Sequence, residues 1–187
     1  MPRRKLARFL LAFAVALAAL SVVLPWLTKP YAWLVLQVVK PDPAVATASL
    51  SGLVIHVSAP RVAGLQPFSA TLHSLVFTYG LAVAVALTVA MPGLSTLRRT
   101  VLILAILLLS FVAHLIGLHF FISRAVAVAG FKATPDDLGR LASVLSLLWF
   151  VLPSLVWLPA FLRQRRAWQR EATAGGDARP AQAKGRA

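Results

Sequence analysis

Residues 100–123 read TVLILAILLLSFVAHLIGLHFFIS, and this stretch, which contains no charged side chain, decides the fold. Three more charge-free stretches occupy residues 9–28, 62–97 and 141–162. A helix needs about 20 apolar residues to cross a bilayer core of roughly 30 Å, and each stretch supplies that length. A soluble domain of 187 residues does not need four such runs. The sequence therefore predicts a polytopic membrane protein.

The composition agrees with a lipid environment. Hydrophobic residues make up 59% of the chain and charged residues 13%, whereas soluble domains carry roughly 45–50% apolar and about 25% charged residues. Cysteine is absent, which excludes a disulfide framework and a thiol nucleophile. We predict an all-α membrane protein, a bundle of four transmembrane helices with a short extracytoplasmic β-like loop.

The net charge of +14 raises the question of a nucleic-acid binder, but the distribution of charge argues against it. Most of the 19 basic residues lie at the ends of apolar runs, in the N-terminal segment, the Arg98–Arg99 turn and the C-terminal tail. Cytoplasmic loops carry such an excess of Lys and Arg. This bias places both termini and the turn in the cytoplasm, and loops 28–68 and 124–140 on the other side. Anionic lipid headgroups are the expected counter-charge, so we expect the lipid bilayer as a partner, and no nucleic acid.

The membrane domain is expected over residues 9–163, after a basic cytoplasmic leader at 1–8 and before a disordered cytoplasmic tail at 164–187. The tail prediction rests on a composition rich in Ala, Gly, Arg, Gln and Pro, without apolar periodicity. Within the membrane domain, residues 29–68 are expected to form an outer loop. The four spans are expected at about residues 9–28, 69–91, 100–123 and 141–162.

The first span leaves two questions open. A basic start, an apolar core and the Ala-Leu-Ala at 16–18 are typical of a cleaved signal peptide, but the apolar run continues to Leu27, which favours an uncleaved anchor. Two prolines are expected to bend or end this helix. Residues 30–39 then either lie at the outer headgroup level, with Tyr31 and Trp33 as interfacial aromatics, or continue the first helix after a kink.

Two local signals shape the outer loops. Residues 53–58 are enriched in β-branched residues with partial alternation, which predicts a strand, and residues 45–50 can pair with it across the Ser-Gly turn at 51–52. An isolated two-stranded hairpin is marginal in water, so we expect it to rest on the membrane face or on a partner. Thr134 and Pro135 are expected to cap and begin the fourth helix outside the membrane.

Small residues recur at helical spacing in the second and third spans. Such residues let helix backbones approach closely inside a membrane. We predict that they serve helix packing within the membrane. They are Gly80, Ala82, Ala86, Ala90, Ala113 and Gly117.

Polar residues near the outer ends of the spans form the candidate polar site, which comprises His73, Tyr79, His119 and Arg124. His73 and His119, together with a loop acid such as Asp136, would make a metal or proton-transfer site. We consider this site because ionisable groups inside a membrane are often functional. The alternative, which we favour, is that neutral histidines near the interface hydrogen-bond to backbone or water. We therefore predict no catalytic residue, no metal site and no cofactor.

The remaining polar residues narrow the choice of function. His114 lies deeper in its span and is expected to pack inside the bundle. All 5 acidic residues lie in loops or in the tail, which disfavours a carboxylate proton relay or a cation transporter. The sequence contains no phosphate-binding loop, dinucleotide fingerprint or zinc-protease helix motif.

The order of features is similar to that of a known family. A kinked first span and a strand-like outer loop precede LVFTYGL at 75–81, which leads into an Ala/Leu/Val-rich span that ends in Pro92-Gly93. Over residues 5–162 the chain resembles the small four-span exosortase H-associated membrane proteins, with Tyr79-Gly80 as the short match. The Asn-Pro usual just before that motif is missing here, and His73-Ser74 stands in its neighbourhood.

The resemblance implies an accessory role beside a membrane transpeptidase that processes C-terminal sorting signals in Gram-negative bacteria, and hence an inner-membrane location. Exosortases themselves use Cys, Arg and His, so this chain, without cysteine, is not expected to be that catalyst. Our leading hypothesis is a non-enzymatic accessory or scaffold protein of the inner (plasma) membrane that binds another membrane protein. The alternatives are a small transporter or channel component, and a membrane enzyme with a histidine-centred extracytoplasmic site.

Overall fold

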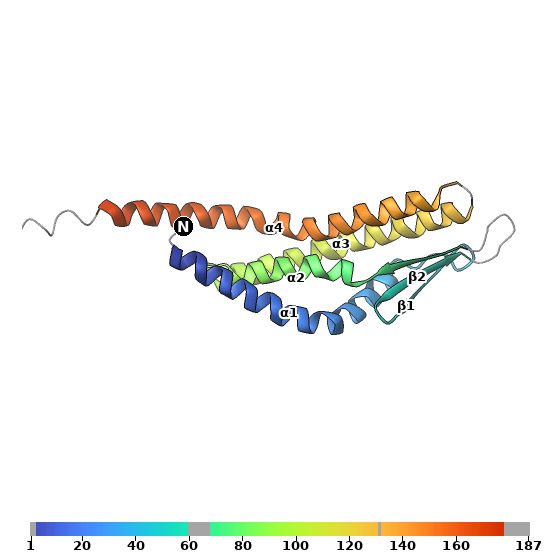
Figure 1. The fold of residues 1–187 in the computed structure, drawn as a ribbon, viewed down its shortest axis with the longest axis horizontal. Coiled ribbons are helices and arrows are strands. Elements are labelled where there is room, and N and C mark those ends of the chain that lie inside the picture. Colours follow the sequence, from blue (N-terminus) through green and yellow to red (C-terminus); the bar gives the residue numbers. More distant parts are fainter. Residues whose placement is uncertain (1–2, 60–67, 131, 178–187) are drawn as a thin grey trace, which may run out of the picture.

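The computed structural model describes residues 3–59, 68–130 and 132–177. The helices run side by side as an elongated bundle, and a small sheet lies at one end of it (Figure 1). The described chain begins and ends at the opposite end. In chain order the elements are α1 (Arg3–Val38), β1 (Thr47–Ser51), β2 (Val54–Ala59), β3 (Phe68–His73), α2 (Leu75–Ala90), α3 (Thr96–Ala129) and α4 (Pro135–Asp177).

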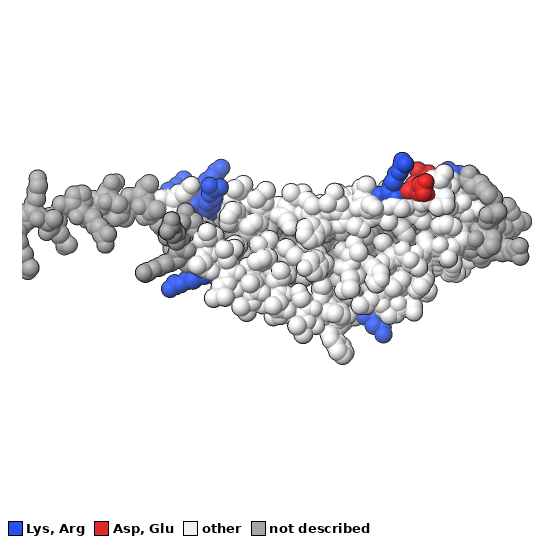
Figure 2. All heavy atoms as spheres, in the orientation of Figure 1, with Lys and Arg blue, Asp and Glu red and all other residues white. Residues whose placement is uncertain are grey.

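Three of the helices are long and apolar enough to cross a membrane, namely Leu6–Val38, Thr96–Ala129 and Pro135–Arg170. Large apolar side chains are exposed along all three. In the view of Figure 2, a broad uncharged band separates the basic side chains at one end from the charged side chains toward the other. A surface of this kind is typical of a helix bundle whose solvent is lipid.

The predicted start of the second span, at residue 69, is wrong. Residues 68–73 form β3, and α2 contains only 16 residues. At 1.5 Å per residue that is about 24 Å, shorter than a bilayer core. The strand forms because FSATLH alternates between exposed and partly buried positions and pairs with β2, which a hydropathy argument over the whole run does not detect.

The first helix settles the alternative left open for residues 30–39. α1 continues to Val38, with Pro25 and Pro30 inside it. Each proline removes a backbone hydrogen bond and crowds the preceding turn, which bends a helix rather than ending it when the rest of the turn is supported. The bend of α1 is visible in Figure 1, and it carries the last turns of the helix against the sheet.

The predicted hairpin is confirmed, and a third strand extends it. β1 and β2 pair antiparallel, with Ser51 opposite Val54, and Gly52 in the turn has φ +62°, a backbone conformation that favours glycine. β3 pairs with the other edge of β2, so the strand order is β1-β2-β3. The sheet lies on the chain's own helices, because α1 contacts β1 and α3 contacts β2 and β3.

The sheet and the helix ends beneath it share one apolar core, and we call this unit the head. It comprises the three strands, the end of α1 from residue 32, the end of α3 from residue 118 and the start of α4. Partly buried side chains of β1 and buried side chains from the other parts meet in it, and the buried ones include Val35, Leu36, Ile55, Val57, Leu72, Phe121, Ile122, Ala125 and Leu138. Burial on the helices supplies the stability that an isolated hairpin lacks.

The tail prediction is also corrected. α4 continues to Asp177, so residues 164–177 are helical rather than disordered. The Ala, Arg, Gln and Glu of this segment are strong helix formers, and Trp168 anchors it because the indole is buried near Gly93 in the α2–α3 turn. The rest of the expected tail, 178–187, lies outside the described residues.

Candidate functional site

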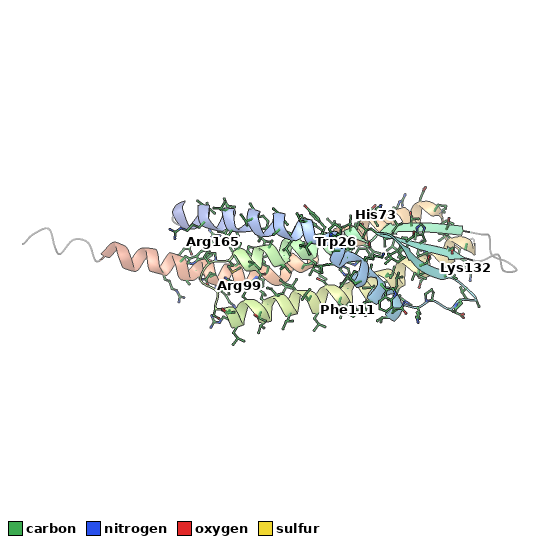
Figure 3. All side chains as sticks on the ribbon, turned by 90° about the horizontal axis from the view of Figure 1, so that it is seen from below. Trp26, His73, Arg99, Phe111, Lys132 and Arg165 are labelled. Atoms are coloured by element: carbon green, nitrogen blue, oxygen red, sulfur yellow. The ribbon has the colours of Figure 1, made fainter. Side chains whose placement is uncertain are left out.

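The structure places the four residues of the candidate polar site on separate features. His73 is exposed at the end of β3 that leads into α2, away from the α3–α4 connection at Lys132 (Figure 3). His119 lines a hollow between α3 and the α1–β1 connection. Tyr79 is half exposed and stacks on Phe150 of α4, with ring centroids 6.4 Å apart.

Arg124 is engaged elsewhere, in an ion pair with Asp137 whose Nη2–Oδ2 distance is 3.2 Å. His119 and Arg124 are five residues apart, which places them about 140° apart around α3. In the part of the chain that the structure describes, no three His, Asp or Glu side chains are grouped so that they would hold a metal ion. The geometry therefore does not assemble the histidine-centred site.

The Arg124–Asp137 pair belongs to the start of α4, which precedes the charge-free stretch. Asp137 accepts hydrogen bonds from the backbone N–H and the hydroxyl of Thr134, each 3.0 Å long, and Thr134 in turn accepts one from the Asp137 N–H. This is the reciprocal capping of a helix N-terminus. The hydrogen bonds from Thr134, and secondarily the charge of Arg124, hold the pKa of Asp137 below its usual value.

A buried polar cluster lies inside the bundle instead, and it consists of Thr28, Tyr31, Thr78 and His114. The Tyr31 hydroxyl is 2.6 Å from Nδ1 of His114, which joins α1 to α3. The Thr28 and Thr78 hydroxyl oxygens are 2.7 Å apart, which joins α1 to α2. Thr28 donates to the Leu24 carbonyl at 2.7 Å, so Thr78 is the donor to Thr28, its other acceptor, the Leu75 carbonyl, being 3.5 Å away.

Aromatic rings enclose the imidazole of His114, which is 0% exposed. The Tyr31 and Trp149 rings both meet it edge-on, with centroids at 5.6 and 5.4 Å. The Trp149 indole N–H donates to the Ala113 carbonyl at 3.3 Å, which ties α4 to α3. His114 of α3 thus packs against side chains of α1 and α4. Edge-on contact is an arrangement that aromatic rings prefer.

His114 packs inside the bundle, as predicted. Tyr31 was expected at the headgroup level in only one of the two alternatives left open. The helix follows the other alternative, and after its bend the Tyr31 ring lies against His114. Trp33, two residues on, is exposed as an interfacial aromatic would be. Helical spacing alone does not distinguish the two, because the direction of a side chain after a kink depends on the bend.

The small residues lie at the closest helix approaches. A Cβ added at Gly80 would lie 2.5 Å from the Trp149 carbonyl oxygen and 2.6 Å from Cα of Phe150, and one added at Gly117 would lie 2.5 Å from the Trp149 ring. Ala82, Ala86 and Ala90 are buried on α2, and Ala113 packs partly buried against the core of the head. Only glycine fits at Gly80 and Gly117 without a shift of the neighbouring atoms.

An apolar groove, with a cavity volume of about 350 Å³, lies beside the polar cluster between α1, α2 and α3. Tyr31 and Thr78 are the polar residues of its lining. The other lining residues are Leu20, Leu24, Leu27, Leu81, Ala82, Val85, Ile103 and Leu107. Polar groups that hydrogen-bond to one another between helices are typical of packing specificity in membrane bundles.

Comparisons with protein-family models, with curated proteins and with solved structures found no match to this chain. We therefore take its function from the geometry. The buried polar groups join helices, the small residues allow close packing, and the head is anchored rigidly on two helix ends. These contacts hold the helices and the head together.

The polar cluster leads to a stability prediction. Tyr31→Phe keeps the ring but removes the hydroxyl that bonds to His114, so we expect the free energy of unfolding in detergent to fall by about 1 kcal/mol. Tyr79→Phe is the matched control, because Tyr79 is exposed. Removal of its hydroxyl is expected to have no measurable effect on the free energy of unfolding. Titration with a denaturing detergent, followed by circular dichroism, measures both. Equal stability of the two variants would contradict a structural role for the hydrogen bond.

Proposed function

We propose that this chain is a non-enzymatic accessory protein of a bacterial inner membrane, which crosses the membrane four times and presents its head to another membrane protein. The observation that carries the proposal is the outer face of the sheet. The inner face is buried on α1 and α3, so the strands hold their outer face in a defined position.

Strand register defines this outer face. Ser49, His56 and Thr71 are direct cross-strand partners, as are Thr47, Ser58 and Ser69. Side chains alternate between the two faces of a strand, so these residues point away from buried Ile55, Val57 and Leu72. The outer face consists of Thr47, Ser49, Ser51, Val54, His56, Ser58, Ser69, Thr71 and His73.

This outer face is suited to a protein partner. It carries hydroxyl and imidazole groups, which both donate and accept hydrogen bonds, and no Lys, Arg, Asp or Glu. Desolvating uncharged polar groups against a complementary surface costs less than desolvating ions. The backbone edges of β1 and β3 add groups that an extended segment of a partner can pair with.

Four membrane crossings are supported by the position of α2. It contacts α1, α3 and α4, so it lies within the bundle rather than on its surface. The α2–α3 turn carries Arg98 and Arg99 and lies at the same end of the bundle as both ends of the described chain. Basic residues favour the cytoplasmic side, so both termini are assigned to the cytoplasm and the head to the other side.

The identity of the partner is taken from the resemblance seen in residues 75–81. It implies an exosortase-type transpeptidase that processes sorting signals. The two other hypotheses have weaker support. The side chains of the polar cluster bond to one another, which does not favour a transport path. In the described residues no three His, Asp or Glu side chains are grouped to hold a metal ion, which does not favour a histidine-centred metal enzyme.

Thiol crosslinking in intact cells tests the proposal, because the chain has no natural cysteine. Ser49→Cys and Thr71→Cys place a thiol on the outer face of the sheet, Lys132→Cys places one elsewhere on the head, and Ser95→Cys places one in the turn at the other end. With a membrane-impermeant thiol-to-amine reagent, we expect a crosslinked product of one discrete mass from Ser49→Cys and Thr71→Cys only. Mass spectrometry then identifies the partner.

Three results would count against this proposal. Recovery of monomer alone from both sheet positions, at normal protein level, would contradict docking on this face. Reaction of Ser95→Cys in intact cells would contradict the topology. A discrete partner that is not a transpeptidase would retain the scaffold function and reject the partner that the resemblance implies.

A further inference from the structure

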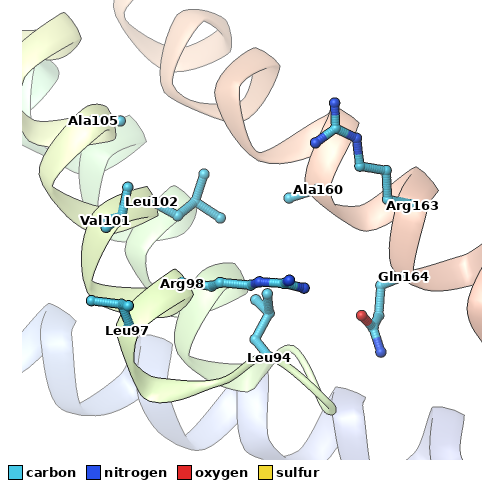
Figure 4. A pocket seen from close by; sticks show the side chains of 9 residues that line it. All are labelled: Leu94, Leu97, Arg98, Val101, Leu102, Ala105, Ala160, Arg163 and Gln164. Atoms are coloured by element: carbon cyan, nitrogen blue, oxygen red, sulfur yellow. The ribbon is translucent and has the colours of Figure 1, made fainter.

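We propose that a cavity between α3 and α4, at the end of the bundle opposite the head, binds the headgroup phosphate and the upper acyl chain of an anionic phospholipid. The cavity has a volume of about 550 Å³ and is lined by both helices. Arg98 and Arg163 both line the cavity; in Figure 4 Arg98 extends from α3 toward α4, whereas the Arg163 side chain runs back along α4 past Ala160. Gln164 lies beside Arg98 at its outer end.

The lining combines two basic side chains with a larger number of apolar ones. Along α3 the chain runs from Arg98 through Val101 and Leu102 to Ala105, which is about 10 Å toward the middle of the bundle at 1.5 Å per residue. α4 runs in the opposite direction, so Ala160 lies deeper than Arg163. A phospholipid offers the same combination, because it joins a charged phosphate to hydrocarbon.

The two arginines are available for an anion. Among the described residues, neither Arg98 nor Arg163 has a carboxylate within ion-pair distance, whereas neighbouring Arg99 donates to the Met91 carbonyl at 3.2 Å. Asp136 and Asp137 lie in the first turn of α4, next to Leu138 of the head, at the other end of the bundle. Guanidinium groups bind phosphate oxygens through paired N–H donors.

Lipid is favoured over free phosphate by the apolar half of the cavity. A soluble phosphate would contact the arginines and leave that half empty, while an acyl chain covers it. Basic pockets between membrane helices on the cytoplasmic side are known to bind anionic lipid headgroups. The inference concerns the opposite end of the molecule from the proposed docking face and does not depend on it.

Native mass spectrometry of the full chain in detergent, with added phosphatidylglycerol, tests the proposal. The double variant Arg98→Gln/Arg163→Gln is expected to weaken phosphatidylglycerol binding by about 30-fold. The control Arg165→Gln/Arg166→Gln removes the same charge from exposed residues that do not line the cavity, and should weaken it less than about threefold. Ala160→Phe fills the apolar half and should also weaken it. Unfolding in detergent micelles without added lipid checks that each variant is folded.

The other probes decide the ligand class. We expect phosphatidylcholine to bind weakly and inorganic phosphate not to displace phosphatidylglycerol at equal concentration. Displacement by phosphate, with unchanged binding to Ala160→Phe, would overturn the lipid assignment and indicate a free-anion site. Equal losses in the two double variants would overturn the cavity and indicate diffuse attraction to a basic surface.

Discussion

Trp149→Ala is expected to lower the free energy of unfolding by about 3–5 kcal/mol, as large-to-small substitutions of buried aromatics do. The Trp149 side chain is 2% exposed, and it is the largest of the fully buried side chains. Its ring lies over Gly117, meets His114 edge-on at 5.4 Å and donates to the Ala113 carbonyl. Removing the ring leaves a cavity between the helices, and Gly117 loses the ring that packs against it. Lipid cannot enter to fill this space, so the packing contacts are lost.

Trp26→Ala is the matched control for this variant. Trp26 is also a membrane-helix tryptophan, but it is 81% exposed, so its removal changes the lipid-facing surface and leaves the interior intact. Unfolding by a denaturing detergent, followed by tryptophan-independent circular dichroism, measures both variants. A loss of stability for Trp26→Ala as large as that for Trp149→Ala would show that indole transfer into lipid, rather than packing, dominates.

Gly80→Val is expected to separate α2 from α4 and to lower stability by about 3 kcal/mol, the upper end of the usual cost of overpacking. The first added carbon would lie 2.5 Å from the Trp149 carbonyl oxygen and 2.6 Å from Cα of Phe150. These are backbone atoms of a helix, so they cannot move aside as the end of a flexible side chain can. Gly80→Ala should already be destabilising, and Gly80→Val more so.

Two further glycines calibrate this result. Gly139 on α4 has nothing within 4 Å of an added Cβ, so Gly139→Ala is expected to be neutral or to stabilise by up to about 1 kcal/mol through helix propensity. Gly117→Ala meets a side chain rather than backbone and should fall between the two. The same detergent titration measures all three. Equal stability of Gly80→Ala and Gly139→Ala would refute the close α2–α4 contact.

The long apolar runs could be read from the sequence because each property involved is local. A charge-free stretch such as residues 100–123 must avoid water whatever its neighbours are, and α3 includes all of it. The hairpin turn was equally local, since Gly52 supplies the positive φ. Thr134 likewise caps α4 through contacts three residues away.

The candidate site was predicted less well, because its residues were chosen by their depth in the membrane. Depth along a helix says nothing of direction around it, and His119 and Arg124 point to different neighbours. The partners in the polar cluster, Tyr31 and His114, are 83 residues apart in the chain. Only the bend of α1 and the crossing of α3 bring them together.

What the sequence by itself determined is the solvent of this chain: apolar runs, basic ends and one glycine turn specify helices in lipid with a strand pair between them. What only the tertiary structure decided is which residues meet. Residues 68–73 became a strand because β2 offered an edge, and residues 164–177 became helix with Trp168 buried as an anchor. The physical reason is that solvation acts on each residue separately, whereas strand pairing, helix crossing and hydrogen bonds across the bundle depend on atoms that distant parts of the chain contribute.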